Sequence, residues 1–192
     1  MQDILYNLMS TEFENPWKTI RSRPIYDNPW IAVREEDVLK PNGAPGIYGV
    51  VSFKNKAIGI VPVDSEGYTY LVGQFRYTLN EYSWEIPEGG GPMNEAPLET
   101  AKRELEEETG LHAATWSELG RIHTSNSVTD EEGFLFLATD LTPGPSNPED
   151  TEQLIIKRVS LKDAVAMVMR GEITDSLSIA GLLKAFMIVS SY

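Results

Sequence analysis

Alternation of apolar and polar residues predicts a series of short β-strands in the first half of the chain. Residues rich in Asn, Asp, Gly and Pro separate these stretches and are typical of turns. Residues 1–16 show no clear period and predict an arm that precedes the first strand. The predicted strands of this half cover residues 17–25, 30–38, 47–53, 57–63 and 68–75.

Helical periodicity enters in the second half of the chain. A glycine-rich loop at 87–92 leads into a predicted helix over 97–109, with Pro97 suited to its first turn and Gly110 to the residue after its last. Strands at 118–123, 134–138 and 154–159 follow, and then helices at 161–169 and 176–189, with Ser160 and Asp175 as N-caps. Strands on both sides of a central helix, followed by C-terminal helices, indicate an α/β fold in which helices cover both faces of a mixed sheet.

Composition narrows the class of protein. The chain has 192 residues, of which 41% are apolar and 23% charged, as in a globular protein with a substantial core. A net charge of −13 argues against a nucleic-acid surface, but it permits a small anionic substrate if divalent cations lie in between. With no cysteine, no membrane-length apolar run and no signal-peptide pattern at the start, we expect a cytoplasmic protein with no membrane partner.

Three glutamates gather on one side of the predicted helix at 97–109. At 100° per residue, Glu104, Glu107 and Glu108 fall within roughly a 100° arc. Two carboxylates ~5 Å apart repel by roughly 0.8 kcal/mol in bulk water and by roughly 3 kcal/mol at an effective dielectric of 20. This spacing has two interpretations, a solvated acidic face or a site for a hard divalent cation such as Mg²⁺ or Mn²⁺.

The whole segment around these glutamates favours the cation site. It reads Gly89, five residues, Glu95, seven residues, and then Arg103-Glu104-Leu105-Glu106-Glu107-Glu108-Thr109-Gly110-Leu111. This resembles the Nudix box, G-x5-E-x7-R-E-(aliphatic)-x-E-E-x-G-(aliphatic), at every specified position. The resemblance implies an α/β/α sandwich with a mixed central sheet, and a pyrophosphohydrolase that acts on nucleoside diphosphates linked to another moiety. It also implies that Arg103 and Glu95 pair to hold the box in shape.

The same resemblance assigns the metal ligands. Glu104, Glu107 and Glu108 are expected to bind Mg²⁺ or Mn²⁺, and the backbone carbonyl of Gly89 or of the next glycine adds a ligand. Such ions neutralise the diphosphate, polarise its P–O bonds and activate a water. Glu107 and Glu108 are therefore also catalytic candidates.

A narrower resemblance lies outside the box. Three stretches look like those of ADP-ribose and ADP-sugar pyrophosphatases, namely residues 74–77, 81–91 and 125–131. In that group the arginine matching Arg76 contacts the substrate, and the glutamate matching Glu85 lies at the metal and phosphate site. Its members are typically homodimers whose N-terminal strands cross to the partner. We therefore expect an arm and dimerisation strands at 1–44, and a Nudix domain at 45–192 with its box at 89–111.

One departure from that group leaves the substrate open. ADP-ribose pyrophosphatases usually carry a proline soon after the box, whereas this chain has none between Pro97 and Pro143. ADP-ribose is thus one candidate, and ADP-glucose or another nucleotide sugar is nearly as strong. We predict cleavage to a nucleoside monophosphate and a sugar phosphate. The alternatives are a Nudix enzyme for NADH or a coenzyme A derivative, and a non-catalytic domain that binds a nucleotide sugar.

Further substrate contacts have weaker signals. Trp30, Tyr82 and Trp84 could stack on the nucleobase, although an aromatic residue in a strand is more often part of a core or an interface. Glu131 follows a turn-like stretch and is a candidate for lining the cleft, with a solvated loop as the alternative. We retain Trp30 and Glu131 as candidate substrate-binding residues.

The general base is expected in a late loop. Attack on phosphorus needs a water held by a carboxylate within hydrogen-bond reach. The loop at 141–153 is rich in Pro and Gly, ends in acidic residues, and has the length of loops that act as lids. We choose Glu152 as the base or as an extra metal ligand. If this loop is merely solvated, the base lies among Glu107, Glu85, Asp150 and Glu131.

Overall fold

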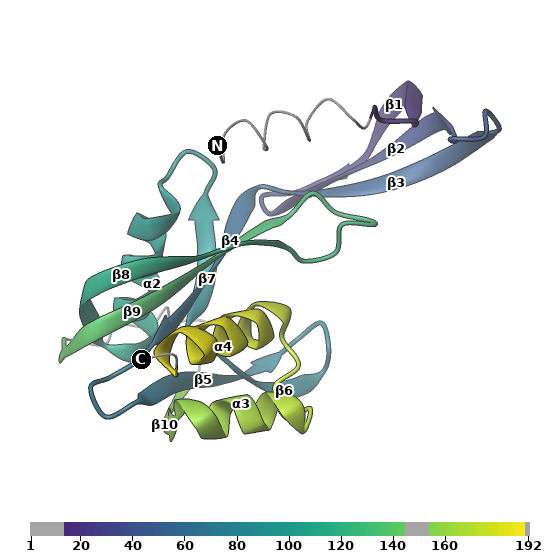
Figure 1. Ribbon diagram of the computed structural model, residues 1–192. Helices are drawn as coiled ribbons and strands as arrows, with labels where there is room; N and C mark the ends of the chain where they lie inside the picture. Colours follow the sequence, from purple (N-terminus) through teal and green to yellow (C-terminus); the bar gives the residue numbers. More distant parts are fainter. Residues whose placement is uncertain (1–13, 145–153, 191–192) are drawn as a thin grey trace, which may run out of the picture. The chain divides into compact units, whose positions relative to one another are not determined.

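The computed structural model describes residues 14–144 and 154–190, and its contacts divide the chain into two compact units (Figure 1). The first unit runs to Phe53 and takes in the short segment Val128–Asp130. The second unit comprises Lys54–Ser127 and the chain from Glu131 onward. In the described residues, no helix has the length and apolar character needed to cross a membrane.

The first unit is an antiparallel sheet in the order β1-β2-β3. Its strands are β1 (Lys18–Asp27), β2 (Ile31–Leu39) and β3 (Pro45–Phe53). Arg23 of β1 donates to Glu35 and Asp37 of β2, at 3.1 Å and 2.9 Å, so opposite charges tie the outer strand to the central one. Nearly every residue of β1 is exposed.

In its described residues, the second unit contains two sheets and three helices. The four-stranded sheet has the order β7-β4-β9-β8, with β4 (Asn55–Pro62), β7 (Glu88–Pro92), β8 (Leu111–His123) and β9 (Glu132–Pro143). The three-stranded sheet has the order β10-β5-β6, with β5 (Tyr68–Arg76), β6 (Glu81–Glu85) and β10 (Ile155–Ser160). The helices are α2 (Pro97–Thr109), α3 (Leu161–Met169) and α4 (Ser176–Val189). Because β4 pairs with β9 in parallel and with β7 antiparallel, the four-stranded sheet is mixed.

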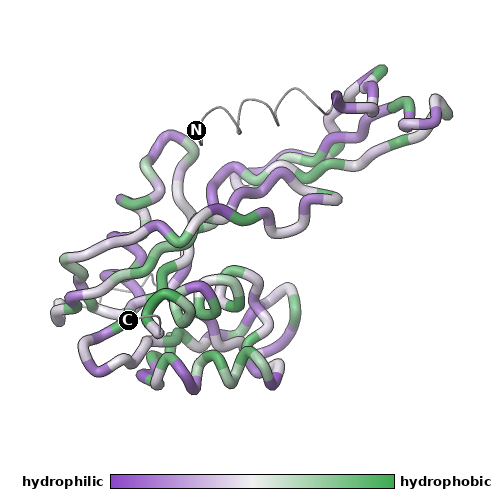
Figure 2. Tube along the Cα trace, in the orientation of Figure 1, coloured by the Kyte–Doolittle hydropathy of each residue, from purple (hydrophilic) through white to green (hydrophobic). Residues whose placement is uncertain are grey.

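Helices cover both faces of this four-stranded sheet. Successive residues of a strand point to opposite faces, and in β9 Phe136 packs in one core cluster with Leu105 of α2, whereas Leu135 packs in the other with Leu182 of α4. Figure 2 shows apolar positions along α4 and the strands beside it. Each such buried Leu or Phe contributes about 1.5–3 kcal/mol relative to an exposed one. The expected mixed sheet between helices is confirmed.

The helix ends agree with the sequence, and their caps show why. Pro97 is at the first turn of α2, and Gly110 follows its last with a positive φ of 67°. The Ser160 side chain accepts the backbone N–H of Asp163 at the start of α3, and Asp175 does the same for Ser178 at the start of α4. These interactions satisfy N–H groups that a helix leaves unpaired in its first turn.

Three strand predictions need correction. Residues 87–92, expected as a glycine-rich loop, contain strand β7, which pairs with β4 from Asn55 to Gly59. Strand β6 was not expected, and β8 begins at Leu111 rather than at 118. Glycines carry no alternation of apolar and polar side chains, so a strand made of them has no periodic signal.

Candidate active site

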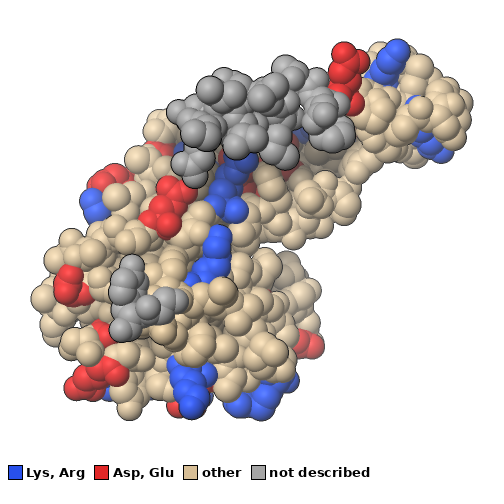
Figure 3. Space-filling model, viewed as in Figure 1, with Lys and Arg blue, Asp and Glu red and all other residues tan. Residues whose placement is uncertain are grey.

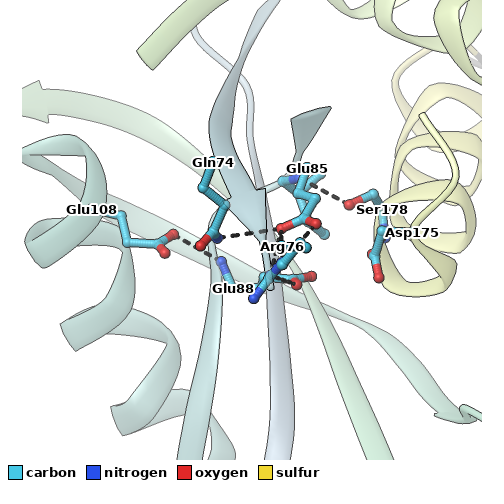
Figure 4. A network of polar contacts seen from close by, with 8 residues as sticks. Gln74, Arg76, Glu85, Glu88, Glu108, Asp175 and Ser178 are labelled. Carbon is cyan, nitrogen blue, oxygen red and sulfur yellow. Dashed lines mark hydrogen bonds and ion pairs between the residues drawn. The ribbon is translucent and has the colours of Figure 1, made fainter. Parts of the chain in front are cut away.

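An arginine–carboxylate cluster joins the ends of β5 and β6 to the start of β7 (Figure 4). Arg76 Nε donates to both carboxylate oxygens of Glu85, at 2.9 and 3.0 Å. Its Nη2 donates to Glu85 as well, and to Glu88 Oε1 at 2.6 Å. Gln74 Nε2 adds a longer bond of 3.4 Å to Glu85 Oε2. The cluster therefore fixes one edge of a guanidinium against two acidic side chains.

Burial and neighbouring charges shift the pKa values of Arg76 and Glu88 in this cluster. The side chain of Glu85 is 3% exposed, and that of Glu88 is 15% exposed. Burial alone would lower the pKa of Arg76, but Glu85 and Glu88 raise it above its usual range. The pKa of Glu88 is raised well above the usual range, first by burial and then by the charges of Asp175 and Glu85. These surroundings therefore disfavour the charged form of Glu88, and Arg76 opposes that effect.

Two polar atoms of the cluster have no protein partner in the part of the chain that the structure describes. One is Glu88 Oε2, which is buried. The other is Arg76 Nη1, since the bonds of Arg76 run through Nε and Nη2 and its side chain is about one-third exposed. A buried carboxylate oxygen without a hydrogen-bond donor destabilises the folded protein. A guanidinium with an open N–H can donate a hydrogen bond to a phosphate oxygen.

Helix α2 brings two of the three predicted metal glutamates, Glu104 and Glu108, to β7. Glu108 is 3% exposed, and its Oε2 accepts the backbone N–H of Glu88 at 2.9 Å. Glu104 lies so close to Gly89 that a Cβ there would be 2.1 Å from its Cδ, so any larger residue at this position would force the Glu104 carboxylate to move. Glu107 is less buried and binds Arg103 Nη1 at 2.6 Å.

Arg103 offsets the repulsion within this glutamate cluster. Its Nη2 lies 2.7 Å from Glu104 Oε1 and its Nη1 lies 2.6 Å from Glu107 Oε2, so one cation serves two carboxylates. The expected pairing of Arg103 with Glu95 was wrong: Glu95 instead accepts the hydroxyl of Thr100 at 2.5 Å. The box is held in shape, but through different partners.

The chemistry of these donors fits a hard divalent cation. Within residues 14–144 and 154–190, no three His, Asp or Glu side chains form a complete metal-binding group. Mg²⁺ usually takes only one or two carboxylates and completes its octahedron with waters and substrate phosphates. Glu104 and Glu108 beside the backbone of β7, with the unpaired oxygen of Glu88 nearby in the chain, supply the oxygen donors that such an ion prefers.

The start of α4 anchors the connection between β6 and β7. Ser178, which is fully buried, accepts the backbone N–H of Ile86 at 2.9 Å. Asp175 accepts the N–H of Ser178 at 2.7 Å and adds its charge to the surroundings of Arg76 and Glu88. Sequence reasoning identified Asp175 only as an N-cap and missed Glu88 and Ser178, because no local pattern shows that α4 returns to this strand.

The remaining candidate residues belong to other segments of the chain. Trp30 belongs to the first unit, where it is 67% exposed in the turn before β2. Glu131 belongs to the second unit, and its Oε2 accepts the hydroxyl of Thr124 at 2.6 Å. Trp84 contacts Tyr82 edge to face and packs against the core, which favours the core interpretation for Trp84. Glu152 lies outside the described residues.

Charged side chains are interspersed on the face shown in Figure 3. Many of the cations are engaged in ion pairs, such as Arg158 with Asp64 and Glu66, or Arg121 with Glu132. The sequence has an excess of acidic residues, and these ion pairs engage several of its cations. The cluster around Arg76 offers an anion both an open guanidinium donor and potential metal ligands.

Comparisons with known proteins agree with this geometry. Residues 17–51 match the model of the nucleoside diphosphate sugar hydrolase N-terminal domain, and residues 54–176 match that of the NUDIX domain. An ADP-ribose pyrophosphatase of Mycobacterium tuberculosis is 32% identical over 93% of this chain and 87% of its own length. One from Bacillus subtilis is 34% identical over 83% of this chain and 86% of its own. The fold resembles that of a solved ADP compounds hydrolase, with a TM-score of 0.83 and 18% identity, covering 94% of this chain and 97% of that one.

Proposed function

The chain belongs to the Nudix family of pyrophosphohydrolases, and from this premise we propose that it cleaves a nucleoside diphosphate sugar of the ADP-ribose or ADP-sugar type. The products are a nucleoside monophosphate and a sugar phosphate. The observation that carries the proposal is Arg76, whose Nε and Nη2 are fixed by Glu85 and Glu88 while Nη1 has no partner among the described residues. A guanidinium held in this way is pre-oriented to bind a phosphate oxygen.

The acidic character of the site requires a cation between protein and diphosphate. We assign Glu104, Glu107, Glu108 and the backbone carbonyl of Gly89 as the ligands of Mg²⁺ or Mn²⁺. The bound ion supplies charge neutralisation and polarisation of the P–O bond. Arg76 orients the diphosphate, and Glu85 holds Arg76 in place through its two bonds to Nε.

The reaction adds water across the phosphoanhydride. The water oxygen bonds to one phosphorus, the bond from that phosphorus to the bridging oxygen breaks, and the bridging oxygen leaves with the other phosphate. A carboxylate must hold the attacking water. We propose Glu152 for this role, or as a further metal ligand, and Glu107 or Glu108 as the catalytic alternatives within the box. For the base of the nucleotide, the exposed ring of Trp30 is the proposed stacking surface, and Glu131 a proposed polar contact.

A hydrolysis screen tests the function. With saturating Mg²⁺, we expect ADP-ribose or an ADP-sugar to yield AMP and a sugar phosphate, resolved by ³¹P NMR and chromatography, and we expect EDTA to abolish turnover. Faster turnover of NADH or a coenzyme A derivative would transfer the assignment to that substrate class. Tight binding of a nucleotide sugar without any turnover would instead identify a non-catalytic binding domain, and full activity in EDTA would rule out the metal role.

We also propose that the protein is a homodimer formed through the first unit. Several large apolar side chains of this unit are exposed in the single chain, among them Ile20, Ile25 and Ile47. An apolar hollow lined by Ile20, Val38 and Ile47 lies on the same unit. Exposed apolar surface of this kind marks an interaction site. Sedimentation equilibrium should give twice the chain mass of 21.4 kDa at micromolar concentration; a single-chain mass would contradict the proposal.

A further inference from the structure

A separate hollow lies on the α2 side of the four-stranded sheet in the second unit. Its volume is about 430 Å³, within the range of small-molecule sites. Strands β8 and β9 supply its aromatic walls, Trp116, Phe134 and Phe136, and the first turn of α2 closes it with Pro97 and Leu98. Glu118 of β8 pairs with Phe136 of β9, so these two residues lie side by side in the sheet. Trp116 is two residues from Glu118 in β8, and its side chain therefore points to the same face.

This hollow is distinct from the candidate active site. The start of α2 lines the hollow, whereas the glutamate cluster, from Glu104 to Glu108, belongs to the second half of the same helix. At 1.5 Å per residue, Leu98 and Glu108 are separated by about 15 Å along the helix axis. None of the residues that line the hollow belongs to the cluster around Arg76.

The lining sets the chemistry of an occupant. The indole N–H of Trp116 already donates to Ala113 O at 3.1 Å, and its ring meets Phe136 edge to face at 6.4 Å. The aromatic walls therefore offer ring surfaces rather than hydrogen-bond donors. The carboxylate of Glu118 also lines the hollow, and within the described ranges it has no hydrogen-bond or ion-pair partner.

We propose that this hollow binds a small organic cation with a flat apolar body, of the aryl-amidinium or guanidinium type. The cation pairs with Glu118 while its planar body lies against Trp116 and Phe134. Aromatic faces attract cations, and a carboxylate at the same site adds a charge-assisted hydrogen bond. The charge of Glu118 disfavours an anionic ligand. This site is independent of the hydrolysis proposed above, and loss of hydrolytic activity has no bearing on it.

Benzamidinium is a suitable probe, with benzamide as its uncharged counterpart. The titration uses full-length protein saturated with Mg²⁺, followed by calorimetry and by the ¹⁵N–¹H signals of the tryptophan indoles, with that of Trp116 assigned through Trp116→Phe. We expect one benzamidinium site that shifts the Trp116 signal, at least tenfold weaker binding of benzamide, and at least tenfold weaker benzamidinium binding to Glu118→Gln. Glu172→Gln, an exposed carboxylate outside the hollow, should bind as the wild type does.

Three results would overturn the assignment. The first is an absence of benzamidinium binding to the wild type at millimolar concentration. The second is equal affinity in the Glu118→Gln protein, because this exposed side chain can be changed without disturbing the core. The third is benzamidinium binding that leaves the indole signal of Trp116 unchanged, which would place the probe outside this hollow.

Discussion

Replacing Glu108 with Gln is expected to lower kcat by roughly 10²-fold or more, since metal-assisted electrostatic stabilisation commonly contributes several kcal/mol. The fold should persist. Glu108 accepts the backbone N–H of Glu88 at 2.9 Å, and the amide oxygen of Gln can accept the same bond. What the substitution removes is one negative charge among the proposed metal ligands. Without metal, the protein should be as stable as the wild type or slightly more so, because a like-charge repulsion is removed.

The matched control for Glu108→Gln is Glu106→Gln. Glu106 belongs to the same helix, but its side chain is 43% exposed and lies 3.6 Å from His112 Nδ1, away from β7. Single-turnover hydrolysis and Mn²⁺ binding, followed by electron paramagnetic resonance, should separate the two variants. Mn²⁺ should also raise the Tm of the wild type and of Glu106→Gln more than that of Glu108→Gln. Equal losses in both variants, or wild-type Mn²⁺ affinity in Glu108→Gln, would show that Glu108 is not a ligand.

The helices could be predicted from sequence because residues typical of helix ends stand at their first and last turns. Pro97 and Gly110 mark the two ends of α2, and Ser160 and Asp175 accept first-turn N–H groups of α3 and α4. Such signals involve residues only two or three positions apart, so they are readable without the tertiary structure. The side of α2 that packs inward can also be recognised from sequence, since Ala101 and Leu105 recur at helical spacing, and both are buried.

The strand beside the metal glutamates could not be predicted in this way. Strand β7 has the sequence EGGGP, and its glycines are explained by neighbours far along the chain. A Cβ on Gly91 would lie 2.6 Å from Thr100 Oγ1, just as one on Gly89 would collide with Glu104. Close approach of α2 selects glycine here, and the same glycines remove the alternating pattern by which a strand is recognised.

The residues of the candidate site also differ in whether local spacing or distant contacts determine their position. Spacing alone placed Glu104, Glu107 and Glu108 on one side of the helix. The role of Glu88 depends on Arg76, twelve positions earlier, and that of Ser178 on Ile86, ninety-two positions earlier. The second contact follows from the return of α4 to the connection between β6 and β7, and the first from the approach of β5 to β7; neither can be seen in a short sequence window.

Replacing Arg76 with Met should destabilise the protein by about 2–4 kcal/mol and lower kcat/KM by roughly 10²-fold. Breaking a buried ion pair typically costs 3–5 kcal/mol, and the lower range applies here because the side chain of Arg76 is 36% exposed. Glu85, at 3% exposure, and Glu88, at 15%, would then face one another and Asp175 without a cation. The loss of activity follows from the loss of the N–H groups proposed to bind phosphate.

The loss of stability in Arg76→Met should grow with pH. The pKa of Glu88 is already raised by burial and by Asp175, and Arg76 is the neighbour that lowers it. Without Arg76 the folded protein holds its carboxyl protons more tightly than the unfolded chain does, so stability falls as pH rises above about 4.3, the ordinary pKa of Glu. Urea unfolding in EDTA should therefore show a larger deficit at pH 8 than at pH 5, and Glu88→Gln added to Arg76→Met should reduce it. Arg121→Met, which breaks only the exposed pair with Glu132, should stay within about 0.5 kcal/mol of the wild type. If Arg76→Met loses no more stability than Arg121→Met, or loses the same amount at both pH values, the carboxylates do not depend on this cation.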